Sequence, residues 1–262
     1  MSYRYLTLAK QGPLARLTLN RPENFNSFHI GLGEELQAAV RECEDEQVRA
    51  VLISGAGKHF CAGGDVKWMR DNLGEDFGAA FDALIDACHP PIMALRNLPK
   101  PVIAAIQGFA SGAGFSLAMA CDYRIAAENA KFNQAYVNIG LSPDCGSSYF
   151  LTRALGPVLA IDLIFTGRVV AAEEALRLGI VNQVVPQEEF AQTVEQVAAS
   201  FANGPTKAYA AAKLLVNKAL ENDLATQLAL EQKLVVENAQ SDDFSEGLQA
   251  FFEKRPTRFI GK

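Results

Sequence analysis

Two glycine-rich turns, each placed directly after an apolar run, constrain the fold of this chain more than any other feature. The first turn is residues 60–65 (FCAGGD), which follow the apolar run at 50–54. The second is residues 108–114 (GFASGAG), which follow the run at 102–106. Short apolar runs bounded by such turns predict buried strands. Because glycine lacks a Cβ, its backbone can approach a ligand closely, and unpaired N–H groups can face one small acceptor. The two turns together therefore predict an oxyanion hole.

Strand and helix patterns alternate over most of the chain. Alternating apolar and polar residues predict two short strands within 1–20, and an apolar stripe at helical spacing predicts a helix over 30–42. Strand, turn and helix then recur at 50–70, 101–121 and 122–158. A repeated unit of this kind predicts a fold of the α/β class.

The pattern becomes almost entirely helical near residue 187. We expect a core over residues 1–195 and a C-terminal helical segment over residues 196–262. The predicted helices of this last part span 188–202, 207–222, 223–239 and 245–254.

Residues 67–90 are less regular, because Asn72, Gly74, Gly78 and Pro90 interrupt any helical stripe. This stretch is interpreted either as a mobile flap over a substrate or as a plain surface loop.

Composition excludes several classes of protein. A length of 262 residues with 49% hydrophobic content supports a large buried core, and a net charge of −6 argues against a nucleic-acid partner. The five cysteines form no C-x-x-C pair, so neither disulfides nor a metal site is expected. Residues 1–6 lack the apolar core of a signal peptide, and no apolar stretch is long enough to cross a membrane. The expected location is cytoplasmic.

The two turns also carry a family resemblance. FCAGGD followed by KPVIAAI-x-G-x-A-x-GAG at 100–114 resembles the crotonase, or enoyl-CoA hydratase/isomerase, superfamily. Residues 19–26 (LNRPENFN), 172–181 (AEEALRLGIV) and 251–255 (FFEKR) are similar to that family as well. The resemblance implies a spiral ββα core, an acyl-CoA thioester substrate and no separate cofactor, since coenzyme A enters as part of the substrate. It also implies a homotrimer or a dimer of trimers, with the C-terminal segment covering the active site and forming trimer contacts.

The resemblance assigns the oxyanion hole to the backbone N–H groups of Gly64 and Ala113, which would bind the thioester carbonyl oxygen. Asp65 and Gly112, in the same turns, are expected to lie beside the substrate. Taken singly, each turn could equally exist only to allow tight packing of a strand against a helix.

The acid and base of a hydratase are missing from this chain. The family's two glutamates fall on Ser116 and Tyr136, neither of which is a carboxylate. Adding water to a double bond needs one group to activate the water and another to protonate carbon. We therefore expect hydration to be slow, with both residues remaining as substrate contacts.

Asp144 is the alternative carboxylate, in the segment 140–146 (GLSPDCG). Ser142 is a plausible N-cap and Pro143 a favourable first helical residue, so Asp144 is predicted in the first turn of a helix. It could lie there only to complement the helix dipole. The segment, however, is similar to enoyl-CoA isomerases that resemble 1,2-epoxyphenylacetyl-CoA isomerase, where the aspartate is the single catalytic acid. One carboxylate suffices to move a double bond, because it can remove one proton and return another.

His89 supports a competing hypothesis. Its spacing before Pro101 is similar to that of the hydrolytic histidine in 4-chlorobenzoyl-CoA dehalogenase, a family member with an aspartate matching Asp144. In that chemistry the aspartate attacks carbon and the histidine activates water. The alternative interpretation is that His89 lines the pocket or is only structural.

Two lysines could contact coenzyme A by resemblance, although both could equally be solvated surface charges. Lys67 follows the first turn, and Lys254 could reach a ligand bound by a neighbouring subunit. The backbone around Cys61 and Ala62 is expected to meet the adenine.

The leading hypothesis is isomerisation of 3-enoyl-CoA to 2-enoyl-CoA, with ring-derived or aromatic-pathway thioesters among the expected substrates. Two alternatives stay open. One is hydrolysis through an aspartyl ester at Asp144 with His89 as the base. The other is an acyl-CoA-binding protein of the hydratase family with weak hydratase activity.

Overall fold

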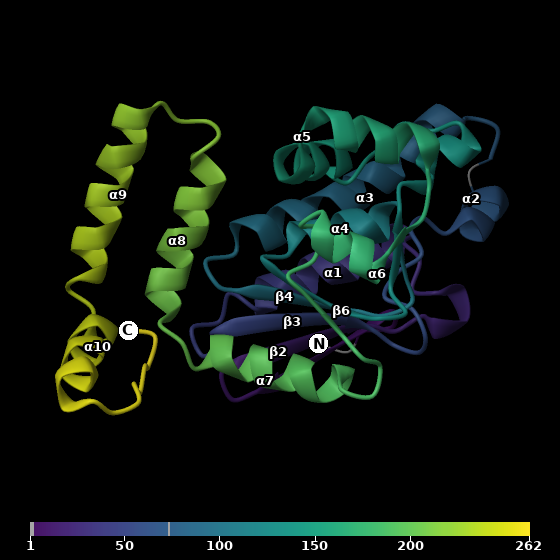
Figure 1. Ribbon diagram of the computed structural model, residues 1–262. Helices are drawn as coiled ribbons and strands as arrows, with labels where there is room; N and C mark the ends of the chain where they lie inside the picture. Colours follow the sequence, from purple (N-terminus) through teal and green to yellow (C-terminus); the bar gives the residue numbers. More distant parts are fainter. Residues whose placement is uncertain (1–2, 73) are drawn as a thin grey trace.

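The main sheet has six strands, and all but one of its neighbouring pairs are parallel. Figure 1 shows the computed structural model, which describes residues 3–72 and 74–262. Strand β1 pairs antiparallel with β2, and the remaining neighbours run parallel in the order β1-β2-β3-β4-β6-β9. The strands are β1 (Leu6–Gln11), β2 (Leu14–Leu19), β3 (Ala50–Gly55), β4 (Val102–Ile106), β6 (Tyr123–Ala127) and β9 (Gln183–Val185). The predicted strands at 1–20, 50–54 and 102–106 and the α/β class are thus confirmed.

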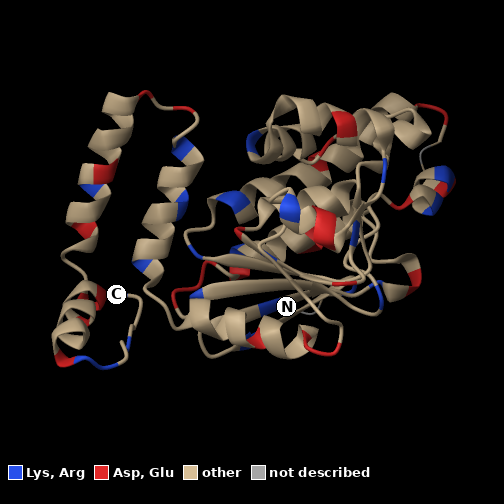
Figure 2. Cartoon of the chain, in the orientation of Figure 1, with Lys and Arg blue, Asp and Glu red and all other residues tan. Residues whose placement is uncertain are grey.

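Both faces of this sheet are buried. Val51 and Ile53 of β3 belong to the larger apolar cluster, whereas Ala50 and Leu52 belong to a second cluster on the opposite face. Successive side chains of a strand point to opposite faces, so a strand covered on both sides must be apolar throughout. Figure 2 agrees: charged residues lie mainly on helices and loops, and β3 and β4 contain none.

Several helices cover one face of the sheet and α7 (Phe190–Ala202) covers the other (Figure 1). Helix α7 contributes Val194, Ala198 and Ala202 to the second apolar cluster. The helices on the first face are α1 (Ile30–Glu42), α3 (Phe77–Asn97), α4 (Ala113–Ala120), α5 (Ser147–Thr166) and α6 (Ala172–Arg177).

A small second sheet carries the second glycine turn away from the main sheet. It consists of β5 (Phe109–Ser111), β7 (Lys131–Asn133) and β8 (Val170–Ala171), in the order β5-β7-β8. Strand β5 follows β4 after two residues and leads directly into α4. This strand-strand-helix sequence recurs with β6, β7 and α5, as the repeated unit predicted.

Most of the described residues of the stretch 67–90 are helical, so the expectation of a plain surface loop is wrong, whereas the mobile flap stays a prediction. Helix α2 (Val66–Asn72) and the long helix α3 occupy it, with Pro90 and Pro91 inside α3. Proline removes a backbone donor from a helix interior, which is why the sequence argued against a helix. Packing overrides that preference: α3 lies so close to α1 that a Cβ on Gly33 would come within 2.5 Å of the Ala87 carbonyl oxygen.

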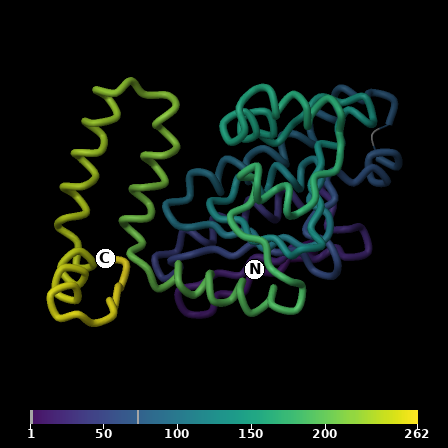
Figure 3. The backbone as a smooth tube through the Cα atoms, viewed as in Figure 1, coloured from purple at the N-terminus to yellow at the C-terminus, as the bar shows by residue number. Residues whose placement is uncertain are grey.

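The last three helices form an arm that extends from the core (Figure 3). They are α8 (Thr206–Lys218), α9 (Leu224–Asn238) and α10 (Asp242–Glu253), close to the predicted ranges. The predicted boundary between 195 and 196 falls inside α7, which is part of the core, so the arm begins after residue 202. Helix α9 buries none of its residues in the chain.

One helix, α5, is long and apolar enough to span a membrane by length and composition. Its backbone is not continuous, because Gly156 has non-helical torsions (φ 76°, ψ 165°) immediately before Pro157. The element is therefore two shorter helices joined at a kink, and both pack into the core, the first through Phe150 and Leu151 and the second through Leu163.

Candidate functional site

The two glycine turns meet in the structure. Cys61 and Ala110 form a parallel bridge, in which the Cys61 N–H donates to the Phe109 carbonyl (3.0 Å) and the Ser111 N–H donates to the Cys61 carbonyl (3.0 Å). Gly114 allows this approach, since a Cβ there would lie 2.1 Å from the Cys61 oxygen. The start of α4 is thus held directly against the first turn.

Both predicted hole donors are unpaired. Among the described residues, no acceptor takes the N–H of Gly64 or of Ala113. The two turns are close at this point, because a Cβ added to Gly63 would lie 3.7 Å from the Ala113 nitrogen. Ala113 is the first residue of α4, so its N–H also carries the partial positive charge of the helix terminus. The arrangement suits a developing oxyanion.

A cavity of about 190 Å³ opens in front of these donors. Gly64, Ala113 and Asp144, the three predicted catalytic residues, all line it, as do Gly112 and Tyr136. Asp144 is the only Asp or Glu among the described residues of the lining. The rest of the wall is mainly apolar.

Asp144 lies in a loop before α5, so its predicted place in the first helical turn is wrong. Cys145 and Gly146 both have positive φ (51° and 78°), and the Ser147 N–H donates back to the Asp144 carbonyl at 2.9 Å. Two successive left-handed residues close a turn and cannot continue a helix. Helix α5 consequently starts at Ser147. The Asp144 carboxylate lines the cavity and does not cap this helix.

Tyr136 holds this carboxylate. The residue lies in the 3-10 helix η2 (Ala135–Ile139), and its hydroxyl donates a short hydrogen bond to Asp144 Oδ1. Burial, together with the charge of Asp144, raises the pKa of the Tyr136 phenol far above its ordinary value. Tyr136 is therefore a neutral donor at physiological pH and cannot serve as a base.

The two thiols of the cavity are unreactive by the same reasoning. Burial raises the pKa of Cys88 to about 12, and the nearby charge of Asp144 adds to the shift. The pKa of Cys145 is raised by burial and by Asp144 too. Since the thiolate is the nucleophilic form, neither thiol is a nucleophile near neutral pH.

Ser116 lies behind the hole and not in the cavity wall. Its side chain is completely buried, with the hydroxyl 3.2 Å from the Gly112 carbonyl oxygen and 3.4 Å from that of Asp144. The hydroxyl links the Gly112–Ala113 peptide, whose N–H is the second donor, to the backbone of Asp144. It is thus a structural link, where the sequence predicted a substrate contact.

His89 is exposed and absent from the cavity wall. Its Nε2 accepts the Cys145 N–H at 3.2 Å, so the lone pair that would activate a water is already in use. The histidine supports the Asp144 loop from outside.

The residues predicted to contact coenzyme A are scattered. Lys67 is exposed on α2, whereas Lys254, also exposed, ends α10 at the opposite end of the molecule (Figure 1). Cys61 uses both its backbone groups in the bridge, and the Ala62 N–H donates to Phe25, so only the Ala62 carbonyl of this pair has no partner among the described residues. Asp65 is buried in an ion pair behind the turn and does not line the cavity.

The apolar wall that α3 contributes was not predicted from the sequence. Phe81, Leu84, Ile85 and Cys88 line the cavity at the i, i+3, i+4, i+7 spacing of one helical face. That periodicity was readable, but the glycines and prolines around it suggested a loop.

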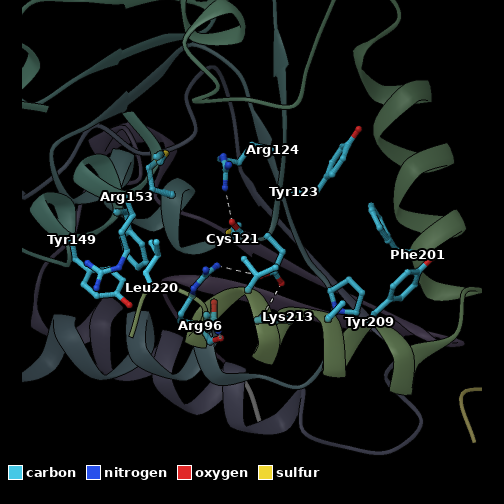
Figure 4. Close-up of a pocket in the computed structure, with 18 residues that line it drawn as sticks. Arg96, Cys121, Tyr123, Arg124, Tyr149, Arg153, Phe201, Tyr209, Lys213 and Leu220 are labelled. Atoms are coloured by element: carbon cyan, nitrogen blue, oxygen red, sulfur yellow. Dashed lines mark hydrogen bonds and ion pairs between the residues drawn. The ribbon is translucent and has the colours of Figure 1, made fainter. Parts of the chain in front are cut away.

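A larger cavity, of about 500 Å³, lies where the arm joins the core, at the other end of α4 (Figure 4). Its acid, Asp122, pairs with Lys213 of α8 (2.8 Å) and Arg96 of α3 (3.4 Å) and accepts the Val102 N–H at 2.9 Å. Because the carboxylate is fully engaged, we interpret this cavity as the joint that ties α8 to the core.

Comparison with known proteins gives consistent matches over the whole chain. Residues 9–262 match the family model described as enoyl-CoA hydratase/isomerase. The chain is 40% identical to the 1,2-epoxyphenylacetyl-CoA isomerase of Escherichia coli K12 over 94% of each chain. It is 37% identical to the crotonyl-CoA hydratase of Syntrophomonas wolfei over the full length of both. The crystal structure of an enoyl-CoA hydratase from Polaromonas sp. JS666 superposes with a TM-score of 0.92, at 36% identity, covering 97% of this chain and 99% of the other.

Proposed function

Because the chain belongs to the enoyl-CoA hydratase/isomerase family, it acts on acyl-CoA thioesters, and we propose that it shifts the double bond of a 3-enoyl-CoA to the 2,3 position. The observation that carries this proposal is that Asp144 is the only carboxylate among the described residues of a cavity that two unpaired backbone donors also line. One carboxylate is what a double-bond shift needs.

The proposed reaction balances with one proton moved and none consumed. The thioester oxygen accepts hydrogen bonds from the Gly64 and Ala113 N–H groups, which stabilise the dienolate that forms when Asp144 removes the C2 proton. The carbonyl then reforms, the C2–C3 double bond appears, and Asp144 returns the proton to C4. Because Asp144 Oδ1 accepts the hydrogen bond from the Tyr136 hydroxyl, we assign the proton transfer to Asp144 Oδ2.

Hydration is the second candidate, because most of the named relatives are hydratases, among them the Syntrophomonas protein. Hydration requires a base for the water and a separate acid for carbon. Tyr136 and Ser116 stand at the two expected positions, and the first is a neutral hydrogen-bond donor to Asp144 while the second is buried behind the hole. These observations favour isomerisation over hydration.

Hydrolysis through an aspartyl ester has less support. It would need a base beside Asp144, yet the Nε2 of His89 is engaged by the Cys145 N–H and its side chain lies outside the cavity.

The cavity also suggests the size of the acyl group. Its volume of about 190 Å³ lies below the roughly 300–1,000 Å³ of typical ligand pockets, and its wall is apolar. We propose a short or compact acyl group, with the coenzyme A portion outside the cavity. We further propose that the protein assembles as a trimer or a pair of trimers.

The test compares 3-hexenoyl-CoA and 2-hexenoyl-CoA as substrates of one preparation. We expect conjugated thioester to form from the first at least about a hundredfold faster than water adds to the second, given the ~10²–10⁴ contribution of a positioned acid or base. Comparable rates would contradict the proposal. Incorporation of label from heavy-oxygen water into Asp144 would instead support the aspartyl-ester route.

A further inference from the structure

A buried ion pair lies directly behind the first hole donor. Arg21 and Asp65 are only 8% and 5% exposed, and Arg21 Nη2 is 2.8 Å from Asp65 Oδ2. Arg21 Nη1 also donates to the Ser27 carbonyl at 2.5 Å. Asn24, in the 3-10 helix η1 (Pro22–Asn24), adds a hydrogen bond to the same Asp65 oxygen at 3.1 Å. Asp65 follows Gly64 directly in the chain.

The second carboxylate oxygen of Asp65 is engaged as well. Oδ1 accepts the Trp68 N–H at 2.9 Å, at the start of α2. Asp65 therefore joins the loop at 21–28, the first turn and α2, and its own side chain does not line the cavity.

Backbone hydrogen bonds on both sides of Gly64 connect this pair to the donor. The Phe28 N–H donates to the Gly63 carbonyl (2.7 Å), and the Asp65 N–H donates to the Phe28 carbonyl (2.7 Å). In a planar trans peptide the C=O and N–H point in opposite directions. Because the Gly63 carbonyl points at Phe28 (2.7 Å), the Gly64 N–H of the same peptide points away from the Phe28 backbone, and Gly64 lines the cavity.

We infer that the Arg21–Asp65 ion pair positions the Gly64 N–H by clamping the loop at 21–28 against the first turn. Neither side chain lines the cavity, so the pair acts through the Phe28–Gly64 bridge. This inference rests on the proposed role of Gly64 as a hole donor. A buried ion pair by itself is weak evidence for a contribution to stability, which leaves orientation as the function to test.

The experiment uses the absorbance of bound 2,4-hexadienoyl-CoA, which moves to longer wavelength when hydrogen bonds polarise the thioester carbonyl. This readout needs no turnover. The single variants are Asp65→Asn and Arg21→Lys. The double variant Arg21→Gln/Asp65→Asn is included in case Asp65→Asn folds poorly, because it leaves no unpaired buried charge. Asp122→Asn is the matched control, because Asp122 also accepts a backbone N–H and pairs with cations, but at the arm joint.

We expect the native protein to show the wavelength shift and Asp65→Asn and the double variant to lose at least about half of it. Their isomerisation kcat should fall by about tenfold to a hundredfold, with KM changed by less than about threefold, as for loss of a contact stronger in the transition state. Arg21→Lys keeps the charge and should recover part of the shift. Asp122→Asn should leave the shift unchanged.

Three other outcomes discriminate between the proposals. A full shift in folded Asp65→Asn or the double variant would overturn the positioning role and leave the proposed function standing. If the variants lose the shift but the native protein does not isomerise 3-hexenoyl-CoA, the positioning role is supported and the proposed function is contradicted. Absence of any shift in the native protein would overturn both.

Discussion

At the scale of single residues, the proposed reaction depends on one carboxylate. Asp144→Asn keeps the volume of the side chain and an acceptor for the Tyr136 hydroxyl but cannot take up a proton. We expect isomerisation to fall by roughly 10²–10⁴ while acyl-CoA affinity changes little. Since Asp144 does not cap a helix, stability should stay close to that of the native protein. Turnover and melting temperature, measured on the same preparation, test this expectation. A fully active Asp144→Asn variant would contradict the proposed mechanism.

Ser116→Ala separates support of the site from chemistry. The change removes a buried hydroxyl that contacts the Gly112 and Asp144 carbonyls, so we expect about 1 kcal/mol of lost stability. Isomerisation should fall by less than about tenfold, because no proton passes through this group. Chemical denaturation and steady-state kinetics provide the measurements. A loss as large as that of Asp144→Asn would show that the serine takes part in proton transfer.

At the scale of elements, the N-terminus of α1 should respond to mild acid. Its cap is His29, whose Nδ1 accepts the Leu32 N–H, and burial lowers the pKa of this imidazole to about 4. A histidine with a lowered folded-state pKa stays neutral when folded while the unfolded chain takes up a proton, so stability falls as pH drops from about 6.5 toward 4. Between pH 7 and 5 this group should account for about 2 kcal/mol of lost stability.

The variant His29→Asn tests that expectation, because asparagine is a good N-cap that does not titrate. Its free energy of unfolding should change less than that of the native protein over the same pH range. An identical pH dependence in the two proteins would show that other groups are responsible.

The contact between α4 and the first turn should tolerate no added atom. In Gly114→Ala the new Cβ would meet the Cys61 carbonyl, a backbone atom that cannot move without displacing the turn. We expect a loss of about 1–3 kcal/mol of stability and reduced turnover, since both hole donors are held by this contact. Gly247→Ala in α10 is the matched control, because its Cβ would meet Phe259 at an ordinary 3.5 Å. That variant should be neutral or up to about 1 kcal/mol more stable. Equal effects of the two changes would contradict the packing argument.

At the scale of the whole molecule, the arm exposes apolar side chains that the chain itself does not cover. They include Leu228 and Val235 of α9 and Phe251 of α10. Many exposed apolar side chains on one part of a protein favour contact with another chain, so we expect sedimentation to give the mass of a trimer or of two trimers and not of one 28.3 kDa chain.

The double variant Leu228→Lys/Val235→Lys should shift that mass toward the single chain with unchanged helix content. Gln232→Lys, an exposed polar position on the same helix, should leave it unchanged. A native protein that sediments as one chain at micromolar concentration would refute the oligomer.

The position of this arm differs from the position expected from the sequence. The helices of residues 203–262 were predictable from their periodicity, but their placement was not. They extend away from the cavity of their own chain instead of covering it, because nothing in a single helix pattern says which surface its apolar face will meet.

The α/β class, the central strands and the two glycine turns could be predicted from the amino-acid sequence, because strand burial and glycine chemistry are local properties. The assignment of the candidate hole donors came from the family resemblance of these turns. Three features became visible only in the folded chain: α3 is helical through two prolines, Asp144 lies before its predicted helix and accepts a hydrogen bond from Tyr136, and Asp65 and Ser116 support the turns from behind. These features depend on contacts between segments far apart in the chain. The distance between a carboxylate and its hydrogen-bond partner is set by how whole helices and strands pack. That packing cannot be read from any short stretch of sequence.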